Sequence, residues 1–272
     1  MPQFAANISL MFTEWPFLDR FSAAAEHGFQ AVEFQFPYEY SAETIARRLE
    51  AAGLALALFN APPGDLAAGD RGLAALPDRF PEFRQQIAQA RLYAAATGAR
   101  RVHVMAGVAD ATDGKAREAY KNALRHAVET LVDVDVLIEP LNLRDNPGYF
   151  LASFDFAAEI IAELGLPRLK LQYDIYHLQI LHGDVLTNLE ALLPIVGHVQ
   201  IASVPDRHEP GAGELDDERV LRRLDALGYQ GYVGCEYRPA QGTIAGLAWL
   251  EAWRRGREGD IVLKSTWRDR LG

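Results

Sequence analysis

Eight short apolar runs, separated by longer segments with helical spacing, restrict how this chain can fold more than any other feature. The runs are rich in aliphatic and aromatic residues, a composition that favours strands. They lie at Phe4–Leu10, Ala31–Phe36, Leu54–Asn60, Arg101–Ala106, Val134–Leu141, Leu169–Ile175, His198–Ser203 and Tyr232–Tyr237. Strict alternation of strand and helix is typical of a parallel sheet, and eight such units can close into a barrel. The sequence therefore predicts an α/β fold, a single (β/α)8 TIM barrel.

The segments between the runs carry the periodicity and the end signals of helices. Ser41 and Gly53 bracket one such segment, and Ser153 and Gly165 bracket another, in the positions expected of an N-cap and a helix stop. Apolar residues at steps of three and four form one stripe at Phe80, Phe83, Ile87, Ala90 and Ala94. The competing fold is an open doubly wound sheet, but the first strand-to-helix junction lacks its G-x-G-x-x-G turn.

No linker rich in Pro, Gly or Ser divides the chain, so residues 1–255 are expected to form one catalytic barrel domain. The stretch 64–72 is expected to be a long loop after the third run. Residues 256–272 are polar and basic and show no ninth repeat. They are expected to be an appended tail or a packing arm.

Charge and cysteine content exclude several classes of protein. With 27 Lys and Arg against 37 Asp and Glu, the net charge is −10, which disfavours a nucleic acid partner. The first residues lack a basic region before an apolar stretch, and no apolar run reaches the length of about 18 residues that a membrane span needs. One cysteine supports neither an internal disulfide nor a thiolate zinc site. A cytoplasmic protein without a membrane partner is expected.

Four polar residues end or interrupt the last four apolar runs: Glu139, Asp174, Gln200 and Glu236. In a barrel of this kind the carboxyl ends of the strands form the active site, so these side chains should converge. Buried carboxylates that converge need a cation, and an oxygen-only ligand set suits Mg2+ or Mn2+, with Co2+ also possible. Any one of them alone could be a strand-end group satisfied by a backbone amide. Four successive strands favour a metal site.

The motifs VLIEPLN, QYDIYH, HVQIA, PDRHEP and GCEY, together with FAANISLMF, VEFQFPY and FNAPPGD, resemble the hydroxypyruvate isomerase family. That family belongs to the xylose isomerase-like TIM barrels, which use a divalent metal, and the resemblance spans residues 1–254. It implies that Glu139, Asp174, Gln200 and Glu236 hold the metal. It also implies that Glu139 and Glu236 are the paired proton donor and acceptor of the reaction.

Resemblance to the related ketose epimerases implies three further contacts to substrate oxygens. His177, three residues after Asp174, and Arg207 match two substrate-binding positions of those enzymes. Asp145 matches a third, although the epimerases have the longer Glu there. The alternatives are purely structural roles. His177 could be a buried, hydrogen-bonded histidine, and Arg207 could belong to a surface ion pair.

The reaction implied is an aldose–ketose isomerisation of a short hydroxy or oxo acid through an enediolate. Interconversion of hydroxypyruvate and tartronate semialdehyde (2-hydroxy-3-oxopropanoate), part of glyoxylate and carbohydrate metabolism, is the first expectation. The motifs ALFNAPPGD, HVMAGV and VPDRHEP are similar to those of 2-oxo-tetronate isomerases, which is the alternative, followed by a ketose 3-epimerase. An anionic substrate needs an extra cationic contact, for which Arg207 is the first candidate, followed by Arg71, His208 and Lys115.

Two interpretations from other classes are less favoured. A barrel that only binds a sugar or metabolite would have no use for two proton-transfer groups. A barrel endonuclease of the same superfamily would need a His-rich multi-zinc site, and its ligand histidines are missing from the sequence. Barrels of this type often pair, so a homodimer is a further prediction.

Overall fold

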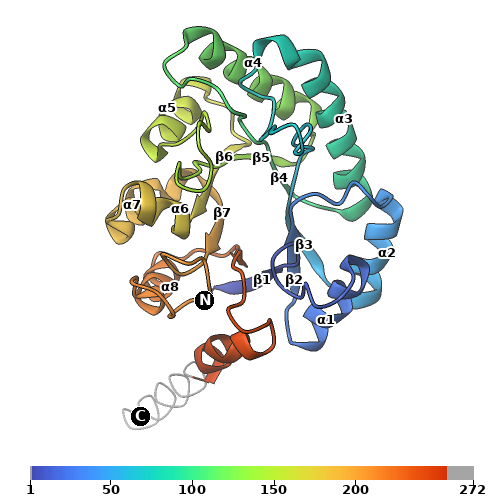
Figure 1. Ribbon diagram of the computed structural model, residues 1–272, viewed down its shortest axis with the longest axis vertical. Helices are drawn as coiled ribbons and strands as arrows, with labels where there is room; N and C mark the ends of the chain where they lie inside the picture. The colour runs from blue at the N-terminus through green and yellow to red at the C-terminus, as the bar shows by residue number, and fades with distance from the viewer. Residues whose placement is uncertain (1, 256–272) are drawn as a thin grey trace, which may run out of the picture.

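The computed structural model describes residues 2–255, and within them eight parallel strands close into a barrel in chain order (Figure 1). The strands are β1 Gln3–Asn7, β2 Ala31–Phe34, β3 Ala55–Asn60, β4 Arg101–His103, β5 Asp135–Ile138, β6 Leu169–Asp174, β7 Val196–Ile201 and β8 Tyr232–Cys235. The pairing of β1 with β8 completes the ring. The predicted barrel is therefore confirmed, and the open sheet is wrong. The predicted tail, residues 256–272, lies outside the described residues.

Helices surround the barrel as an outer layer (Figure 1). They are α1 Arg20–Glu26, α2 Ala42–Ala52, α3 Phe80–Thr97, α4 Gly114–Thr130, α5 Phe154–Leu164, α6 Ile175–Leu181, α7 Val185–Leu192 and α8 Asp217–Ala226. Short 3-10 turns occur at Phe17–Asp19, Pro77–Arg79, Leu193–Ile195 and Ala245–Leu247. Among residues 2–255, none of the helices combines the length and the apolarity needed to cross a bilayer.

The local helix signals act as predicted. The hydroxyls of Ser41 and Ser153 each accept a hydrogen bond from the backbone N–H three residues later, at 3.2 Å in both cases. Gly53 and Gly165 end the two helices in the left-handed conformation, with φ of +65° and +59°. The stripe on α3 packs its aliphatic and aromatic side chains into the core between helices and barrel.

The strands end earlier than the apolar runs predict. β5 stops at Ile138 and β8 at Cys235, so Glu139 and Glu236 lie one residue beyond the ladder. In the first case Pro140 has no N–H to continue the ladder. Both carboxylates therefore stand where the chain turns away from the sheet, at the mouth of the barrel.

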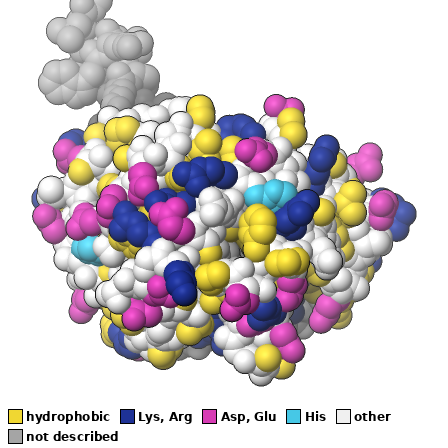
Figure 2. All heavy atoms as spheres, turned by 90° about the horizontal axis from the view of Figure 1, so that it is seen from above, with side chains coloured by type: hydrophobic (Ala, Val, Ile, Leu, Met, Phe, Trp, Pro, Cys, Tyr) yellow, Lys and Arg dark blue, Asp and Glu magenta, His cyan; other side chains and the backbone are white. Residues whose placement is uncertain are grey.

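Charges are mixed on the outer surface. On the face shown in Figure 2, acidic and basic side chains are interspersed, and no broad area of Lys and Arg alone is visible. Several of these charges pair between neighbouring helices, as Arg117 of α4 does with Glu159 of α5 at 2.6 Å. On this face the surface does not resemble one that binds a polyanion.

Asp217, the first residue of α8, should make the stability of the protein depend on pH. Burial raises the pKa of this carboxyl to about 6, and its Oδ1 has no hydrogen-bond partner among the described residues. A raised pKa means that the folded state holds a proton that the unfolded state has lost. This residue's contribution to stability is therefore full below about pH 4 and is lost as pH rises towards 6.

We expect Asp217→Asn to stabilise the protein by roughly 1–3 kcal/mol at pH 8, because the amide stays neutral in the same site. The gain should be smaller at pH 5, where the folded wild type is itself mostly protonated. Urea unfolding at both values measures the difference. An equal gain at pH 5 and pH 8 would contradict the assignment.

Candidate active site

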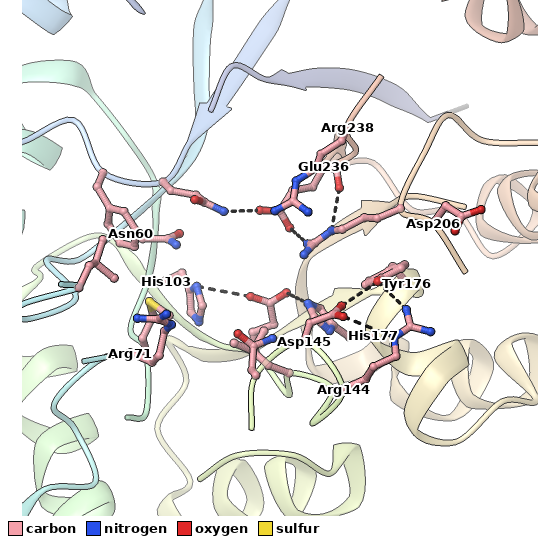
Figure 3. Close-up of a pocket in the computed structure, with 18 of the residues that line it drawn as sticks. Asn60, Arg71, His103, Arg144, Asp145, Tyr176, His177, Asp206, Glu236 and Arg238 are labelled. Atoms are coloured by element: carbon pink, nitrogen blue, oxygen red, sulfur yellow. Dashed lines mark hydrogen bonds and ion pairs between the residues drawn. The ribbon is translucent and has the colours of Figure 1, made fainter. Parts of the chain in front are cut away.

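A cavity of about 650 Å³ opens at the carboxyl ends of the strands. Its wall includes four of the residues singled out from the sequence, namely Glu139, His177, Arg207 and Glu236, and Asp145 lies on its rim. Figure 3 shows the side chains of Asp145, His177 and Glu236 directed towards the same cavity. Asp174 and Gln200 lie beneath this wall, both 1% exposed.

Glu139 is buried at the exit of β5. Its Oε1 makes no hydrogen bond to the described residues, and it lies 4.0 Å from His177 Nε2. Its Oε2 lies 3.5 Å from His103 Nδ1. Burial, followed by the charges of Glu236 and Asp174, raises the pKa of Glu139 well above its ordinary value. The three carboxyls are thus close enough to affect one another.

Asp174 ends β6 and caps the helix that follows. Its Oδ1 accepts a hydrogen bond of 2.8 Å from the backbone N–H of Tyr176 in α6. Its Oδ2 lies 3.3 Å from Arg207 Nη2 and 3.7 Å from His177 Nε2. Burial raises the pKa of Asp174 despite these partners. One oxygen therefore fixes the side chain, and the other faces the site.

Glu236 follows β8 and is held from two sides. Its Oε1 accepts weak hydrogen bonds from Asn7 Nδ2 at 3.3 Å and from Gln35 Nε2 at 3.2 Å. Its Oε2 forms an ion pair of 2.8 Å with Arg207. Burial raises the pKa of Glu236 to about 7, although Arg207 acts in the opposite direction. A carboxyl with such a pKa can both take and give a proton near neutral pH.

Arg207 bridges two of the carboxylates. Its Nη2 contacts both Asp174 Oδ2 and Glu236 Oε2, and its guanidinium stacks 4.8 Å from the centre of the Tyr176 ring. The residue has φ of +56°, a strained backbone for a residue with a side chain. Its side chain is 15% exposed, so the alternative of a surface ion pair is wrong.

The proton of His177 can be assigned from its surroundings. Its Nδ1 accepts a hydrogen bond of 3.0 Å from the backbone N–H of Asn142, which leaves the proton on Nε2. Nε2 faces Asp174 and Glu139. Burial, aided by Arg207, lowers the pKa of His177 well below its ordinary value, so the ring is neutral. This histidine is a hydrogen-bond donor directed into the cavity.

Asp145 is already engaged at the rim of the cavity. Its Oδ2 accepts from Tyr176 Oη at 2.7 Å and from Asn142 Nδ2 at 3.0 Å, and its Oδ1 pairs with Arg144 at 3.4 Å. These contacts lower the pKa of Asp145 against the effect of burial. The Asp145 side chain, which is shorter than the Glu of the ketose epimerases, thus holds Tyr176 and Arg144 in place at the rim.

Gln200 belongs to a buried polar layer across the barrel, formed with Glu33, Gln172 and His198. Gln200 Nε2 donates to Glu33 Oε1 at 2.7 Å, and Gln200 Oε1 accepts from Gln172 Nε2 at 2.6 Å. Glu33 Oε2 lies 2.6 Å from His198 Nε2. Gly234 leaves room for this carboxylate, since a Cβ there would lie 2.2 Å from Glu33 Oε2. The amide orientation of Gln200 is therefore fixed by its neighbours.

Three buried side chains can hold a metal ion. Glu139, Asp174 and His177 offer ligand atoms that all lie within 4.8 Å of one another. The unpartnered Oε1 of Glu139 and the site-facing Oδ2 of Asp174 fit a hard cation. His177 fits less well, because its Nε2 carries the proton that a metal would have to replace. The carboxylates are the better ligands.

Sequence reasoning missed several residues of the site. His103 lines the cavity with no hydrogen-bond partner for either ring nitrogen among the described residues, and burial lowers its pKa to about 3. Glu33 and His198 form the buried pair of the polar layer. His103 and Glu33 interrupt apolar runs just as the predicted ligands do. Both lie in the first four apolar runs, so the same sequence signal marks them.

The sequence profile of the xylose isomerase-like TIM barrel family matches residues 21–253. The 2-oxo-tetronate isomerase of Cupriavidus necator is 52% identical over 257 residues, which cover 93% of this chain and 99% of that protein. The hydroxypyruvate isomerase of Escherichia coli is 40% identical over 258 residues, which cover 93% and 100%. Both relatives are named isomerases, and each match covers 93% of this chain.

Solved structures of other proteins have a fold similar to that of this chain. The crystal structure of a Brucella melitensis protein named AP endonuclease, family 2, is 46% identical, with a TM-score of 0.91 over 93% of this chain and 99% of that one. A 3-keto-D-glucoside 4-epimerase from Escherichia coli has a TM-score of 0.73 at 24% identity, over 93% and 99%. At that identity the second similarity shows the fold alone.

Proposed function

The chain belongs to the xylose isomerase-like TIM barrel family. We propose that it is an aldose–ketose isomerase of a short hydroxy or oxo acid. The observation that carries the proposal is the pair of buried glutamates, Glu139 and Glu236, on the wall of one cavity. A protein that only bound its ligand would have no need of two such groups. The names of the relatives support the same reaction class.

Hydroxypyruvate, interconverted with tartronate semialdehyde, is the first proposed substrate. A 2-oxo-tetronate is the second, and the 52% identity to an isomerase of that name, against 40% to a hydroxypyruvate isomerase, supports it. Both are short acids with a carbonyl beside a hydroxyl-bearing carbon. The same proton transfer would serve either one.

The isomerisation moves a proton between neighbouring carbons through an enediolate. One of the two glutamates, Glu139 or Glu236, removes the proton from the hydroxyl-bearing carbon, and the other returns a proton to the former carbonyl carbon. The hydroxyl proton passes to the former carbonyl oxygen, so that the two oxygens exchange roles. His177 donates its Nε2–H to a substrate oxygen, where negative charge develops. Arg207 keeps the carboxylates of Asp174 and Glu236 in place from the side.

We assign a divalent cation to Glu139, Asp174 and Glu236, with the carbonyl of Gln200, which also accepts a hydrogen bond from Gln172, as the fourth ligand. Mg2+ or Mn2+ suits these oxygen ligands, and Co2+ is acceptable. When bound, such an ion supplies Lewis acidity that stabilises negative charge on the substrate oxygens. The buried Oε1 of Glu139, which forms no hydrogen bond with the described residues, supports this assignment.

Removal of metal is expected to abolish activity. After exhaustive dialysis against a chelator, conversion of hydroxypyruvate should fall to background, and added Mg2+, Mn2+ or Co2+ should restore it. Product formation and proton exchange in D2O, followed by NMR, measure both steps. Undiminished activity in protein shown to be metal-free by elemental analysis would refute the metal assignment, while leaving the two glutamates to be tested separately.

A panel of substrates separates the remaining candidates. Hydroxypyruvate, tartronate semialdehyde, a 2-oxo-tetronate and a neutral ketohexose are offered in parallel. Turnover of one of the acids supports the proposal and identifies the substrate. Epimerisation of the ketohexose, with no reaction of the acids, would favour a ketose 3-epimerase. Ligand binding without any turnover would favour a binding protein.

An endonuclease is less well supported, despite the name given to the Brucella melitensis protein. Among the described residues, the histidines of the cavity wall are His103 and His177, too few for a His-rich multi-zinc site. The net charge of −10 also opposes binding to a polyanion. A cytoplasmic homodimer stays a prediction, and light scattering would measure the oligomeric state.

A further inference from the structure

Within residues 2–255, four arginines line the cavity, and two of them are already neutralised. Arg144 pairs with Asp145, and Arg207 pairs with Asp174 and Glu236. The other two, Arg71 and Arg238, pair with no carboxylate within residues 2–255. Arg207, the first candidate from the sequence for a contact to an anionic substrate, is therefore occupied by the protein's own acids. The unpaired arginines, Arg71 and Arg238, are therefore the better candidates for the cationic contact.

We propose that Arg71 binds the carboxylate of the substrate and so determines the preference for an acid over a neutral sugar. This inference rests on the proposed isomerase function. Arg71 is half-buried in the cavity wall, whereas Arg238 is exposed at the rim. Figure 3 shows Arg71 next to His103, on the opposite side of the cavity from Arg238 and Glu236. Partial burial strengthens its attraction for an anion.

The backbone beside Arg71 is pinned to the exit of β4. Gly72 forms an antiparallel bridge with Ala106, and its N–H donates to the carbonyl of Pro63 at 2.8 Å. With φ of +97°, Gly72 leaves no space for a side chain, since a Cβ would lie 2.2 Å from the Met105 carbonyl oxygen. The long loop predicted from the sequence is thus fixed at the residue next to Arg71.

The guanidinium is oriented but not saturated. Arg71 Nη1 donates to the carbonyl of Asp70 at 2.7 Å, and no other hydrogen bond of this side chain is formed with the described residues. The Asp70 carboxylate is held by Arg79, at 3.2 Å, and by the backbone N–H of Asp65, at 2.8 Å. It is therefore not available to Arg71. Most of the five N–H donors of a guanidinium stay open for a planar carboxylate.

The test compares an acid with its neutral counterpart. Dihydroxyacetone and glyceraldehyde have the carbon skeleton of hydroxypyruvate and tartronate semialdehyde, with hydroxymethyl in place of the carboxylate. In Arg71→Met we expect kcat/KM for hydroxypyruvate to fall roughly 10- to 100-fold, mainly through KM, because a charge-assisted contact is lost. Turnover of dihydroxyacetone should stay unchanged. Arg71→Lys should recover part of the activity, since it keeps the charge but not the fork.

Two further variants are controls. Arg238→Met tests the other unpaired arginine of the wall and should change kcat/KM for the acid only slightly. Arg125→Gln removes a surface arginine of α4 that contacts Asn122, and it should have no effect. An equal loss on acid and neutral substrates in Arg71→Met, or a selective loss in Arg238→Met instead, would overturn the proposal. Thermal unfolding of each variant shows whether the fold is intact.

A binding experiment without turnover tests the role of Arg71 independently of the proposed isomerase function. Glycerate has the carboxylate but no carbonyl to isomerise, and glycerol is its neutral counterpart. Titration calorimetry, with Mg2+ present, should show that the wild type prefers glycerate and that Arg71→Met loses this preference. That result supports the role of Arg71 even if no acid is isomerised. A wild type that binds glycerate no better than glycerol, or an Arg71→Met variant that binds glycerate as the wild type does, refutes it.

Discussion

Glu139→Gln and Glu236→Gln should each lower kcat for the acid substrate by about 10³-fold, because an amide can neither take nor give the proton. The two side chains keep their shape and one oxygen each, so the cavity and the metal ligands are disturbed as little as possible. NMR in D2O measures both the product and the exchange of the C–H proton. We expect neither variant to form product at more than a residual rate.

Exchange of the C–H proton with solvent, measured without product formation, shows which glutamate removes the proton and which returns it. The variant that keeps the base should still exchange the substrate proton with solvent, whereas the variant without it should not. At most one of the two variants is therefore expected to retain exchange from a given substrate. Arg125→Gln serves as the matched surface control. If either glutamine variant kept kcat within tenfold of the wild type, that glutamate would not transfer a proton in the slow step.

Gly234→Ala is expected to destabilise the protein by about 2–4 kcal/mol, the range of a severe core overpacking. The added Cβ would lie 2.2 Å from Oε2, 2.4 Å from Cδ and 2.5 Å from Oε1 of Glu33. Glu33 cannot move aside easily, because Asn7, His198 and Gln200 hold its carboxylate at 3.0, 2.6 and 2.7 Å. Urea unfolding measures the loss.

A double-mutant cycle with Glu33→Ala identifies the cause. Alone, Glu33→Ala removes the carboxylate and leaves its buried partners unsatisfied, so it also destabilises. In the double variant the clash is absent, so the two losses should combine to less than their sum by more than about 1 kcal/mol. Gly114→Ala is the control, since a Cβ there meets no atom within 4 Å. Additive losses would show that the contact with Glu33 is not the source of strain.

Features encoded over short distances could be predicted from the sequence. The bounds of α2 and α5 follow from Ser41, Gly53, Ser153 and Gly165, whose effect is confined to the adjoining turn. The convergence of Glu139 and Glu236 follows from the geometry of any such barrel. Strand ends were predicted less well, since β5 already stops at Ile138, before Pro140, which has no N–H to continue the ladder.

Contacts between distant segments could not be predicted in the same way. Glu33 and His198 pair across 165 residues, and nothing near either one indicates the other. The contacts of Arg207 with Asp174 and Glu236 likewise join positions 33 and 29 residues apart in the sequence. The PDRHEP motif indicated that Arg207 lies near the site, but it did not indicate which carboxylates would contact its guanidinium.

The buried polar layer also limits how stable the molecule can become. The interior of such barrels is ordinarily filled by Val, Ile and Leu, whereas here Glu33, Gln172, His198 and Gln200 occupy one level of it. Two of their atoms, Gln172 Oε1 and His198 Nδ1, have no hydrogen-bond partner among the described residues. Burying these atoms without a hydrogen bond lowers the stability of the folded state. Substitutions intended to raise the unfolding temperature should therefore spare these four residues. An aliphatic interior would make the barrel more stable, but the preorganised site would be lost.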